Sequence, residues 1–189
     1  MLTRHFFKLL LISAFFTWFA TAGAQPSVKN ISADYRTIEV QATDDLAKIA
    51  ALSTRKSLPV LLAFTSSTCG YCEILQNSVL KPMLISGDYD HKVIIRKVVI
   101  DEVLDVVDFD GKTIPISEFT GRYKVFVTPT VLFLDHQGRE LSKRMIGINT
   151  VDYYTADMDN AIDRSVKKFQ QRLQKQPGQL TSTSRREQR

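Results

Sequence analysis

The sequence predicts an α/β protein, with a central mixed β-sheet flanked by helices in a single domain. Two apolar runs, 58–64 and 91–100, enclose a stretch of helical spacing, and this pattern predicts two strands joined by a helix. Two further apolar runs, 125–135 and 141–146, are separated by a turn and predict a hairpin. A chain of 189 residues has the length of about one domain.

The N-terminal part of the domain is predicted to hold a short strand and a helix. The strand falls within residues 31–40. Thr43 is the predicted N-cap of the helix, because Asp44 and Asp45 follow it and negative charge suits the first turn of a helix. This helix leads into the first core strand.

The second predicted helix begins just after the strand at 58–64. Pro82 should bend or end this helix, because proline lacks the N–H group that a helix interior uses. Its apolar face, at helical spacing, consists of Cys72, Leu75, Val79 and Met83. The second cysteine of the protein is therefore expected to be buried.

The C-terminal half is predicted to hold a turn, a short helix, the hairpin and a long helix. The turn lies at Asp110-Gly111, and residues 116–123 form a short amphipathic segment. Asn149 is a candidate cap of the long helix. The buried face predicted for that helix consists of Val151, Tyr154, Met158, Ile162, Val166, Phe169 and Leu173.

The first 24 residues have the pattern of a secretory signal peptide. Arg4 and Lys8 precede a short apolar run, and Ala22-Gly23-Ala24 supplies the small residues that a signal peptidase requires. The run is too short for a membrane-spanning helix, which needs about 20 apolar residues. The protein is therefore expected to be periplasmic, after secretion across the inner membrane.

Four parts are predicted along the chain. A signal peptide (1–24) and an N-terminal extension (25–42) precede the domain (43–173), and a polar, basic, disordered tail (174–189) follows it. The net charge of +5 arises in the signal and the tail, because residues 25–169 carry 18 basic and 19 acidic side chains. A body without excess positive charge argues against nucleic-acid binding.

Both cysteines of the protein lie in one Cys-Gly-Tyr-Cys motif, residues 69–72. A disulfide here would close a loop of four residues and constrain the unfolded chain little, so a purely structural role explains the pair poorly. Zinc would need further ligands, and beyond the signal the chain offers only His91 and His136, both beside predicted turns. We therefore expect redox chemistry, with no metal site and no separate cofactor.

The place of the motif assigns a role to each of its residues. Cys69 falls at a predicted helix N-terminus, where unpaired N–H groups stabilise a thiolate, so it is the predicted nucleophile. Cys72 lies one turn further on, where it can resolve a mixed disulfide. Gly70 and Tyr71 lie between them and are predicted to shape the substrate surface.

Between residues 42 and 169 the chain resembles the thioredoxin superfamily. Within it, the sequence is most similar to the periplasmic thioredoxin-like branch, which includes the thioredoxins of sulfur-oxidation operons and the catalytic domain of the disulfide isomerases. Gly138 and Gly147 match the family's hairpin turn and the glycine before its last helix. The other matching segments are the cysteine motif, Lys97–Asp101, Asp108–Lys112 and Val127–Phe133.

This resemblance implies a thioredoxin fold and adds two substrate-binding residues. Pro129, with a cis bond before it, would face the disulfide. The backbone of Thr128 would then turn outward, where it can pair with an extended segment of substrate.

The sequence departs from the family at positions that bear on proton transfer and on partners. Ala63 stands where cytosolic thioredoxins carry a buried aspartate. Proton transfer at Cys72 would then use water, Glu73 or another group, and Lys97 would lose its usual acidic partner. Thr68 replaces the family's tryptophan, which indicates a different set of partners.

The predicted function is that of an exported, monomeric thiol–disulfide oxidoreductase acting on protein thiols and disulfides. The resemblance favours a reductase that is fed by a membrane-embedded electron donor. A stand-alone isomerase is disfavoured, because fewer than 20 residues separate Ala24 from the first helix, too few for a dimerisation domain.

Two alternatives remain open. One is an oxidase that donates its disulfide. The other is a non-enzymatic copper or haem-maturation chaperone that uses the same thiolates. Cu(I) favours soft sulfur ligands, and Met145 is the only methionine near the expected cis-proline side.

Overall fold

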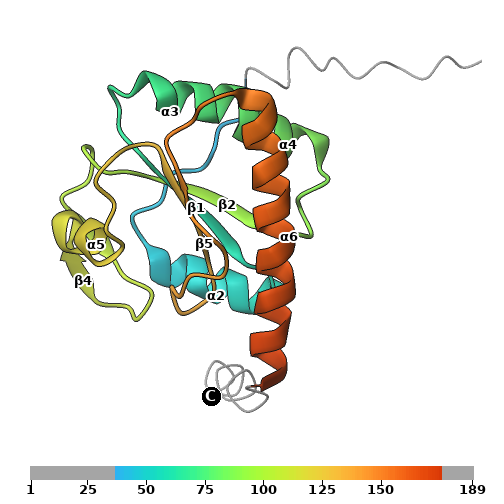
Figure 1. Cartoon of the computed structure of the whole chain (residues 1–189). Coiled ribbons are helices and arrows are strands. Elements are labelled where there is room, and N and C mark those ends of the chain that lie inside the picture. Colours follow the sequence, from blue (N-terminus) through green and yellow to red (C-terminus); the bar gives the residue numbers. More distant parts are fainter. Residues whose placement is uncertain (1–36, 176–189) are drawn as a thin grey trace, which may run out of the picture. The chain divides into compact units, whose positions relative to one another are not determined.

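The computed structural model describes residues 37–175. The predicted signal peptide, most of the predicted strand at 31–40 and nearly all of the predicted tail lie outside the described residues. Within them, a four-stranded mixed sheet lies between two groups of helices (Figure 1). The element order predicted from the sequence is confirmed, with one additional two-stranded sheet.

The four strands of the main sheet are arranged in the order β2-β1-β5-β6. The central strand β1 pairs in parallel with β2 and antiparallel with β5, and β6 pairs antiparallel with β5. The bounds are Val60–Thr65 for β1, Ile94–Val99 for β2, Thr130–Leu134 for β5 and Met145–Ile146 for β6.

Side chains that alternate along β1 divide the core between the two faces of the sheet. Leu61 and Ala63 pack with the cysteine helix and with α6, whereas Leu62 and Phe64 pack with α2 and α5. All six residues of β1 are buried, so neither face of this strand meets solvent. The helices are α2 (Leu46–Lys56), α3 (Gly70–Leu75), α4 (Lys81–Ser86), α5 (Ile116–Arg122) and α6 (Val151–Lys175).

The cap of α2 differs from the prediction. Asp45, not Thr43, is the N-cap, and its carboxylate accepts a hydrogen bond from the backbone N–H of Lys48 at 2.9 Å. Thr43 instead accepts from the N–H of Asp45 through its hydroxyl, at 3.1 Å. The two polar side chains therefore accept from backbone N–H groups around the start of the helix, and the helix starts later than predicted.

Pro82 does not end the cysteine helix. The α-helical pattern of α3 gives way to a π-helical turn, η1 (Gln76–Leu80), and returns to α-helix in α4, which has Pro82 at its first turn. The N–H of Lys81 bonds back to the carbonyl of Gln76, five residues earlier. A π turn of this kind lets the chain pass a proline, which cannot donate in the α pattern. The buried face predicted for this helix is confirmed.

The stretch before α5 contains a hairpin that the sequence pattern did not reveal. Strand β3 (Asp105–Val107) pairs antiparallel with β4 (Thr113–Pro115) around the predicted turn at Asp110-Gly111. In contrast, β5 and β6 are shorter than the apolar runs that predicted them. Phe126 and Val127 lie outside the sheet with exposed side chains, and the run that predicted β6 pairs as a strand only at its end.

The long helix α6 begins at Val151, close to the predicted start, and packs on the sheet. No helix within residues 37–175 combines the length and the apolar character needed to span a bilayer. The buried side chains of α6 are Tyr154, Met158, Ala161, Ile162, Ser165 and Phe169.

Candidate functional site

Cys69 occupies the N-cap position of α3, immediately after the loop that follows β1. The backbone N–H of Cys72 points at the Cys69 sulfur, with 3.2 Å between the two atoms. The carbonyl of Cys69 accepts from the N–H groups of Cys72 and Glu73, which fixes the first turn. A helix N–H directed at a sulfur atom stabilises negative charge on it, so the geometry suits a thiolate at Cys69.

The two cysteines form a disulfide in this structure, with 5.2 Å between their Cα atoms. Cys69 is half-buried, whereas the side chain of Cys72 is 1% exposed. An incoming molecule can therefore reach Cys69 and not Cys72. This asymmetry matches the predicted roles of attacking and resolving cysteine.

The segment before β5 brings Thr128 against the disulfide. The Cys69 sulfur lies 3.5 Å from the carbonyl oxygen of Thr128, although 59 residues separate them in sequence. The peptide bond between Thr128 and Pro129 is cis, and Pro129 is buried. The Pro129 carbonyl accepts from the N–H of Gly147 at 2.8 Å, which ties this segment to the start of the α6 connection.

Exposed apolar side chains lie next in sequence to the cysteines and to Thr128. Tyr71 is 62% exposed and lies between the cysteines, and Phe126 (83%) and Val127 (52%) directly precede Thr128. Gly70 is also exposed, and a Cβ atom at this position would meet nothing within 4 Å. The predicted substrate-binding residues of the motif therefore line an open and partly apolar surface.

The loop before Cys69 is tied to the end of β2 by a carboxylate that the sequence analysis missed. Asp101 accepts hydrogen bonds from the Ser67 N–H at 2.9 Å, the Ser67 hydroxyl at 2.6 Å and the Ser66 hydroxyl at 2.9 Å. The hydroxyl and the backbone N–H of Ser67 together lower the pKa of Asp101 to about 2. One signal was available, because residues that follow neighbouring parallel strands meet at the same sheet edge.

Lys97 has no acidic partner at position 63, and it pairs instead with the side-chain amide of Gln76. Lys97 lies opposite Ala63 in the register of β1 and β2. Its ammonium group donates to the side-chain carbonyl of Gln76 at 2.6 Å, and the Gln76 amide donates to the Cys72 carbonyl at 3.4 Å. Lys97 is therefore partnered rather than a freely solvated strand residue, whereas Glu73 is exposed. Gln76 follows Cys72 by one helical turn, and this spacing could have identified it.

A second polar cluster lies at the other end of β5. The fully buried carboxylate of Asp135 accepts from the N–H groups of Gln137 and Arg139, and from the guanidinium groups of Arg139 at 2.9 Å and Arg172 at 2.5 Å. Burial alone would raise the pKa of Asp135, but the two N–H groups and the two guanidinium groups together hold it below its usual value.

The two histidines considered as metal ligands do not join the cysteines. His91 is exposed before β2, and the ring of His136 packs edge-on against Phe169, with 5.8 Å between ring centroids. In the part of the chain that the structure describes, no three His, Cys, Asp or Glu side chains are grouped so that they could hold a metal ion.

Comparison with protein families assigns the chain that carries these cysteines to a known family. Residues 45–162, more than half of the chain, match the thioredoxin-like domain family. No curated protein matches the sequence.

Several solved structures are similar to this chain. A thioredoxin h from poplar has 17% identity and a TM-score of 0.46, covering 65% of this chain and 96% of its own. Mitochondrial thioredoxin 3 of Saccharomyces cerevisiae has 19% identity and a TM-score of 0.46, with 68% and 97% covered. A thioredoxin of Malassezia sympodialis has 17% identity and a TM-score of 0.47, with 67% and 90% covered.

Proposed function

Because this chain belongs to the thioredoxin-like domain family, we propose that it is an exported reductase of protein disulfides. Its general activity is that of a thiol–disulfide oxidoreductase, with the redox-active pair Cys69 and Cys72. The observation that carries the proposal is the asymmetry of this pair. A half-buried sulfur at a helix N-terminus is accessible, and its partner is 1% exposed one turn away.

The reaction proceeds in two exchanges between sulfur atoms. In the reduced protein, the Cys69 thiolate attacks one sulfur of a substrate disulfide, and the other substrate sulfur leaves as a thiolate that takes up a proton. The Cys72 thiol then loses its proton, and its sulfur attacks Cys69 in the mixed disulfide. The second substrate sulfur leaves as a thiol. Two electrons have passed to the substrate, and the Cys69–Cys72 disulfide has formed.

The surroundings of each sulfur support these two steps. The N–H of Cys72, 3.2 Å from the Cys69 sulfur, stabilises the attacking thiolate. The carbonyl of Thr128, 3.5 Å from the same sulfur, marks where the backbone of an extended substrate can lie. Water reaching Cys72 once the disulfide opens would accept the Cys72 proton in place of an acid at position 63.

Export and the direction of electron flow are parts of the same proposal. The pattern around Ala22-Gly23-Ala24 supports cleavage after Ala24 and a periplasmic location. With a single redox-active pair, each turnover leaves the protein oxidised, so a reductase needs an external donor. We assign that role to a membrane-embedded protein dithiol, because the donor must carry electrons across the membrane.

Trapping of mixed disulfides in the native compartment tests this function. Cys72→Ser removes the resolving sulfur, so substrates should accumulate covalently on Cys69. Cys69→Ser is the matched control and should trap nothing, because the remaining sulfur is buried. A membrane dithiol protein among the adducts supports a reductase. Newly exported proteins alone would support the oxidase, and copper bound to the wild type with no adducts would support the chaperone.

A further inference from the structure

The strand β6 leaves one edge of the main sheet open, close to the disulfide. It is the last strand in the sheet order, and Met145 and Ile146 pair with Val131 and Thr130 of β5. The N–H of Gly147 bonds to the Pro129 carbonyl, so in an antiparallel ladder the N–H and C=O of Ile146 point the other way. Within residues 37–175, no strand pairs with β6 on that side.

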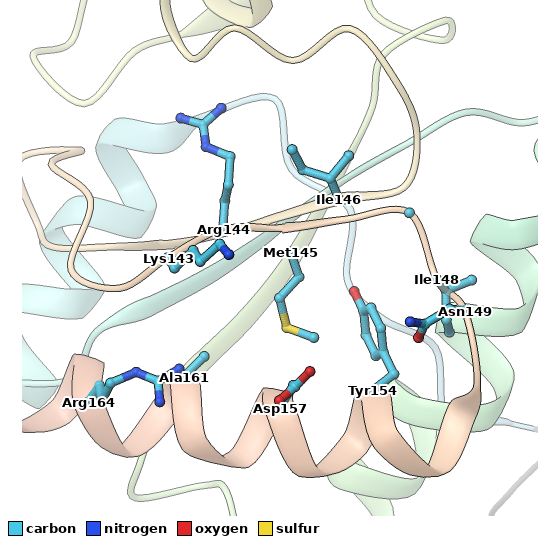
Figure 2. Close-up of a pocket in the computed structure, with 11 residues that line it drawn as sticks. Lys143, Arg144, Met145, Ile146, Ile148, Asn149, Tyr154, Asp157, Ala161 and Arg164 are labelled. Atoms are coloured by element: carbon cyan, nitrogen blue, oxygen red, sulfur yellow. The ribbon is translucent and has the colours of Figure 1, made fainter.

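A cavity of about 600 Å³ lies between β6 and α6. Figure 2 shows Met145 directed from β6 toward α6, whereas Ile146 and Arg144 point away from the helix. Ala161, Asp157 and Tyr154 line the cavity from α6. A strand added beside β6 would direct every second side chain toward α6, which is where the cavity lies.

The floor of this cavity contains an unused hydrogen-bonding group. Tyr154 is 4% exposed, and no described residue makes a hydrogen bond with its hydroxyl. In Figure 2 the hydroxyl end of the ring points toward the β6 segment. Lys143 and Arg164 add positive charge at the lining, against one carboxylate from Asp157. In Figure 2 these two cations lie toward the end of the cavity opposite Tyr154. The unpartnered hydroxyl of Tyr154 is a donor, so it favours an acceptor oxygen from a ligand.

We propose that a substrate polypeptide in extended form pairs with the open edge of β6 as an additional strand and inserts a glutamate or glutamine side chain into the cavity. The inserted side chain packs its aliphatic stem on Met145 and Ala161 and brings its oxygen to the Tyr154 hydroxyl. This inference rests on the proposed function and specifies its substrate class: unfolded segments rather than surface disulfides of folded proteins.

The spacing of strands fixes which residue of the substrate reaches the cavity. Neighbouring strands lie about 4.8 Å apart, so a segment beside β6 is about 10 Å from the line of Thr128 and β5. Three or four extended residues span that distance, at about 3.3 Å each. The glutamate should therefore follow or precede the substrate cysteine by three or four residues.

The test compares peptides with a small disulfide on the reduced full-length protein. Decapeptides of serine and threonine, each with one cysteine as a mixed disulfide with 2-mercaptoethanol, carry a glutamate moved one position at a time. We expect the wild type to reduce the best peptide about tenfold faster than the all-Ser/Thr peptide, with the maximum three or four residues from cysteine. Hydroxyethyl disulfide, which is too small to reach β6, reports the sulfur chemistry alone.

Two pairs of variants separate the open edge from the cavity. Ile146→Pro removes the free N–H, and proline is tolerated on an edge strand whose N–H faces outward; Ile146→Ala keeps the N–H. Asp157→Trp covers the cavity from the exposed face of α6, and Asn160→Trp places the same ring elsewhere on that helix. We expect Ile146→Pro and Asp157→Trp to abolish the tenfold preference, and their controls to retain it.

The outcomes distinguish this inference from the proposed function. If the wild type fails to reduce hydroxyethyl disulfide, the proposed function fails. If that reaction proceeds but the glutamate position has no effect, or if the two tryptophan variants behave alike, the β6 site is wrong. Tyr154→Phe gives an independent check, because it should remove the preference for glutamate over leucine at the best position while leaving reduction of hydroxyethyl disulfide unchanged.

Discussion

The two ends of β5 differ in how firmly their reactive or charged group is held. Just before the strand, the Thr128 carbonyl lies 3.5 Å from the Cys69 sulfur of a disulfide that must open and close. At its end, Asp135 is fully buried and receives two backbone N–H groups and two guanidinium groups. At the redox end, the Cys69 sulfur has few and mostly weak contacts. At the far end, both oxygens of the Asp135 carboxylate accept two hydrogen bonds each.

This difference shows where the protein accepts a buried charge. A buried carboxylate costs several kcal/mol unless it is paired and hydrogen-bonded. At Ala63, under the cysteine helix, the chain has no carboxylate, so opening the disulfide leaves no buried acid to neutralise. At Asp135 the carboxylate is permanently paired and joins the turn after β5 to α6. Reactivity and anchoring are therefore located at separate ends of one strand.

Cys69→Ser should have the largest effect on activity with little effect on stability. Loss of the attacking sulfur should lower kcat/KM for disulfide reduction by about 10³-fold or more, because the one other cysteine in the sequence, Cys72, is only 1% exposed. In urea unfolding under reducing conditions, the variant and the wild type should agree within about 0.5 kcal/mol. A large loss of stability in the reduced variant would show that the redox end also anchors the fold.

Asp135→Asn should have the opposite profile. The amide cannot balance Arg139 and Arg172, and its NH₂ group meets N–H donors, so the free energy of unfolding should fall by about 3 kcal/mol. Disulfide exchange at neutral pH should change little. Urea unfolding gives the first number and an insulin-reduction assay the second. Asp105→Asn, at an exposed carboxylate in β3, is the control and should be neutral in both.

Low pH should reduce the stability that the Asp135 carboxylate contributes, and Asp135→Asn should lack this pH dependence. The folded protein holds the pKa of Asp135 below its usual value. The stabilisation is therefore complete above about pH 4, the unfolded value, and is lost as pH falls through the lower folded value. Urea unfolding at pH 7, 5 and 3 should show the wild type approaching Asp135→Asn in stability as pH falls. Parallel curves for the two proteins would contradict this account.

A smaller effect is expected from Asp101→Asn at the redox end. The asparagine oxygen replaces only part of the bonds to Ser66 and Ser67, so the loop that carries Cys69 should be less well positioned. We expect kcat/KM to fall about fivefold, the equivalent of about 1 kcal/mol. Because the pKa of Asp101 is about 2, the wild-type loop should stay tied at pH 4.

Alkylation of reduced Cys69 by iodoacetamide between pH 4 and 9 measures this positioning directly. The Asp101→Asn variant should need a higher pH for the same rate, and Glu102→Gln, at the next exposed carboxylate, should not. An unchanged alkylation profile in Asp101→Asn would mean that the carboxylate only stabilises the loop and does not position the sulfur.

The sequence predicted the parts of the fold that rest on periodicity and on the cysteine motif. The strand–helix–strand order and the buried position of Cys72 follow from apolar spacing, because a buried face must repeat every turn. The hairpin of β3 and β4 was missed because each strand has three residues, too few to show alternation. Pro82 does not end its helix, because the π turn just before it accommodates a residue that lacks an N–H group.

At the site, the residues that react were easier to predict than the residues that support them. Cys69 and Cys72 were predicted from their spacing at the start of a helix, and Thr128 and Pro129 from the resemblance to thioredoxins. Asp101 binds the loop at Ser67, which is distant from it in sequence. Gln76 pairs with Lys97, although it has a different side chain and lies on a different element from the acid that the family carries at position 63. The available signals, the one-turn spacing of Gln76 from Cys72 and the position of Asp101 after a parallel strand, indicate proximity to the site but not which partner each side chain contacts.

The complete burial of β1 has a consequence for the synthesis of the protein. Val60 pairs with Ile94 on one side and with Leu134 on the other, so this strand gains its second neighbour only when residues up to Leu134 have left the ribosome. Until then Val60–Thr65, six uncharged residues of high β-propensity, presents an unpaired edge to any other nascent chain. A chaperone that holds the growing chain over this interval would shield the strand on which both ends of the redox domain depend.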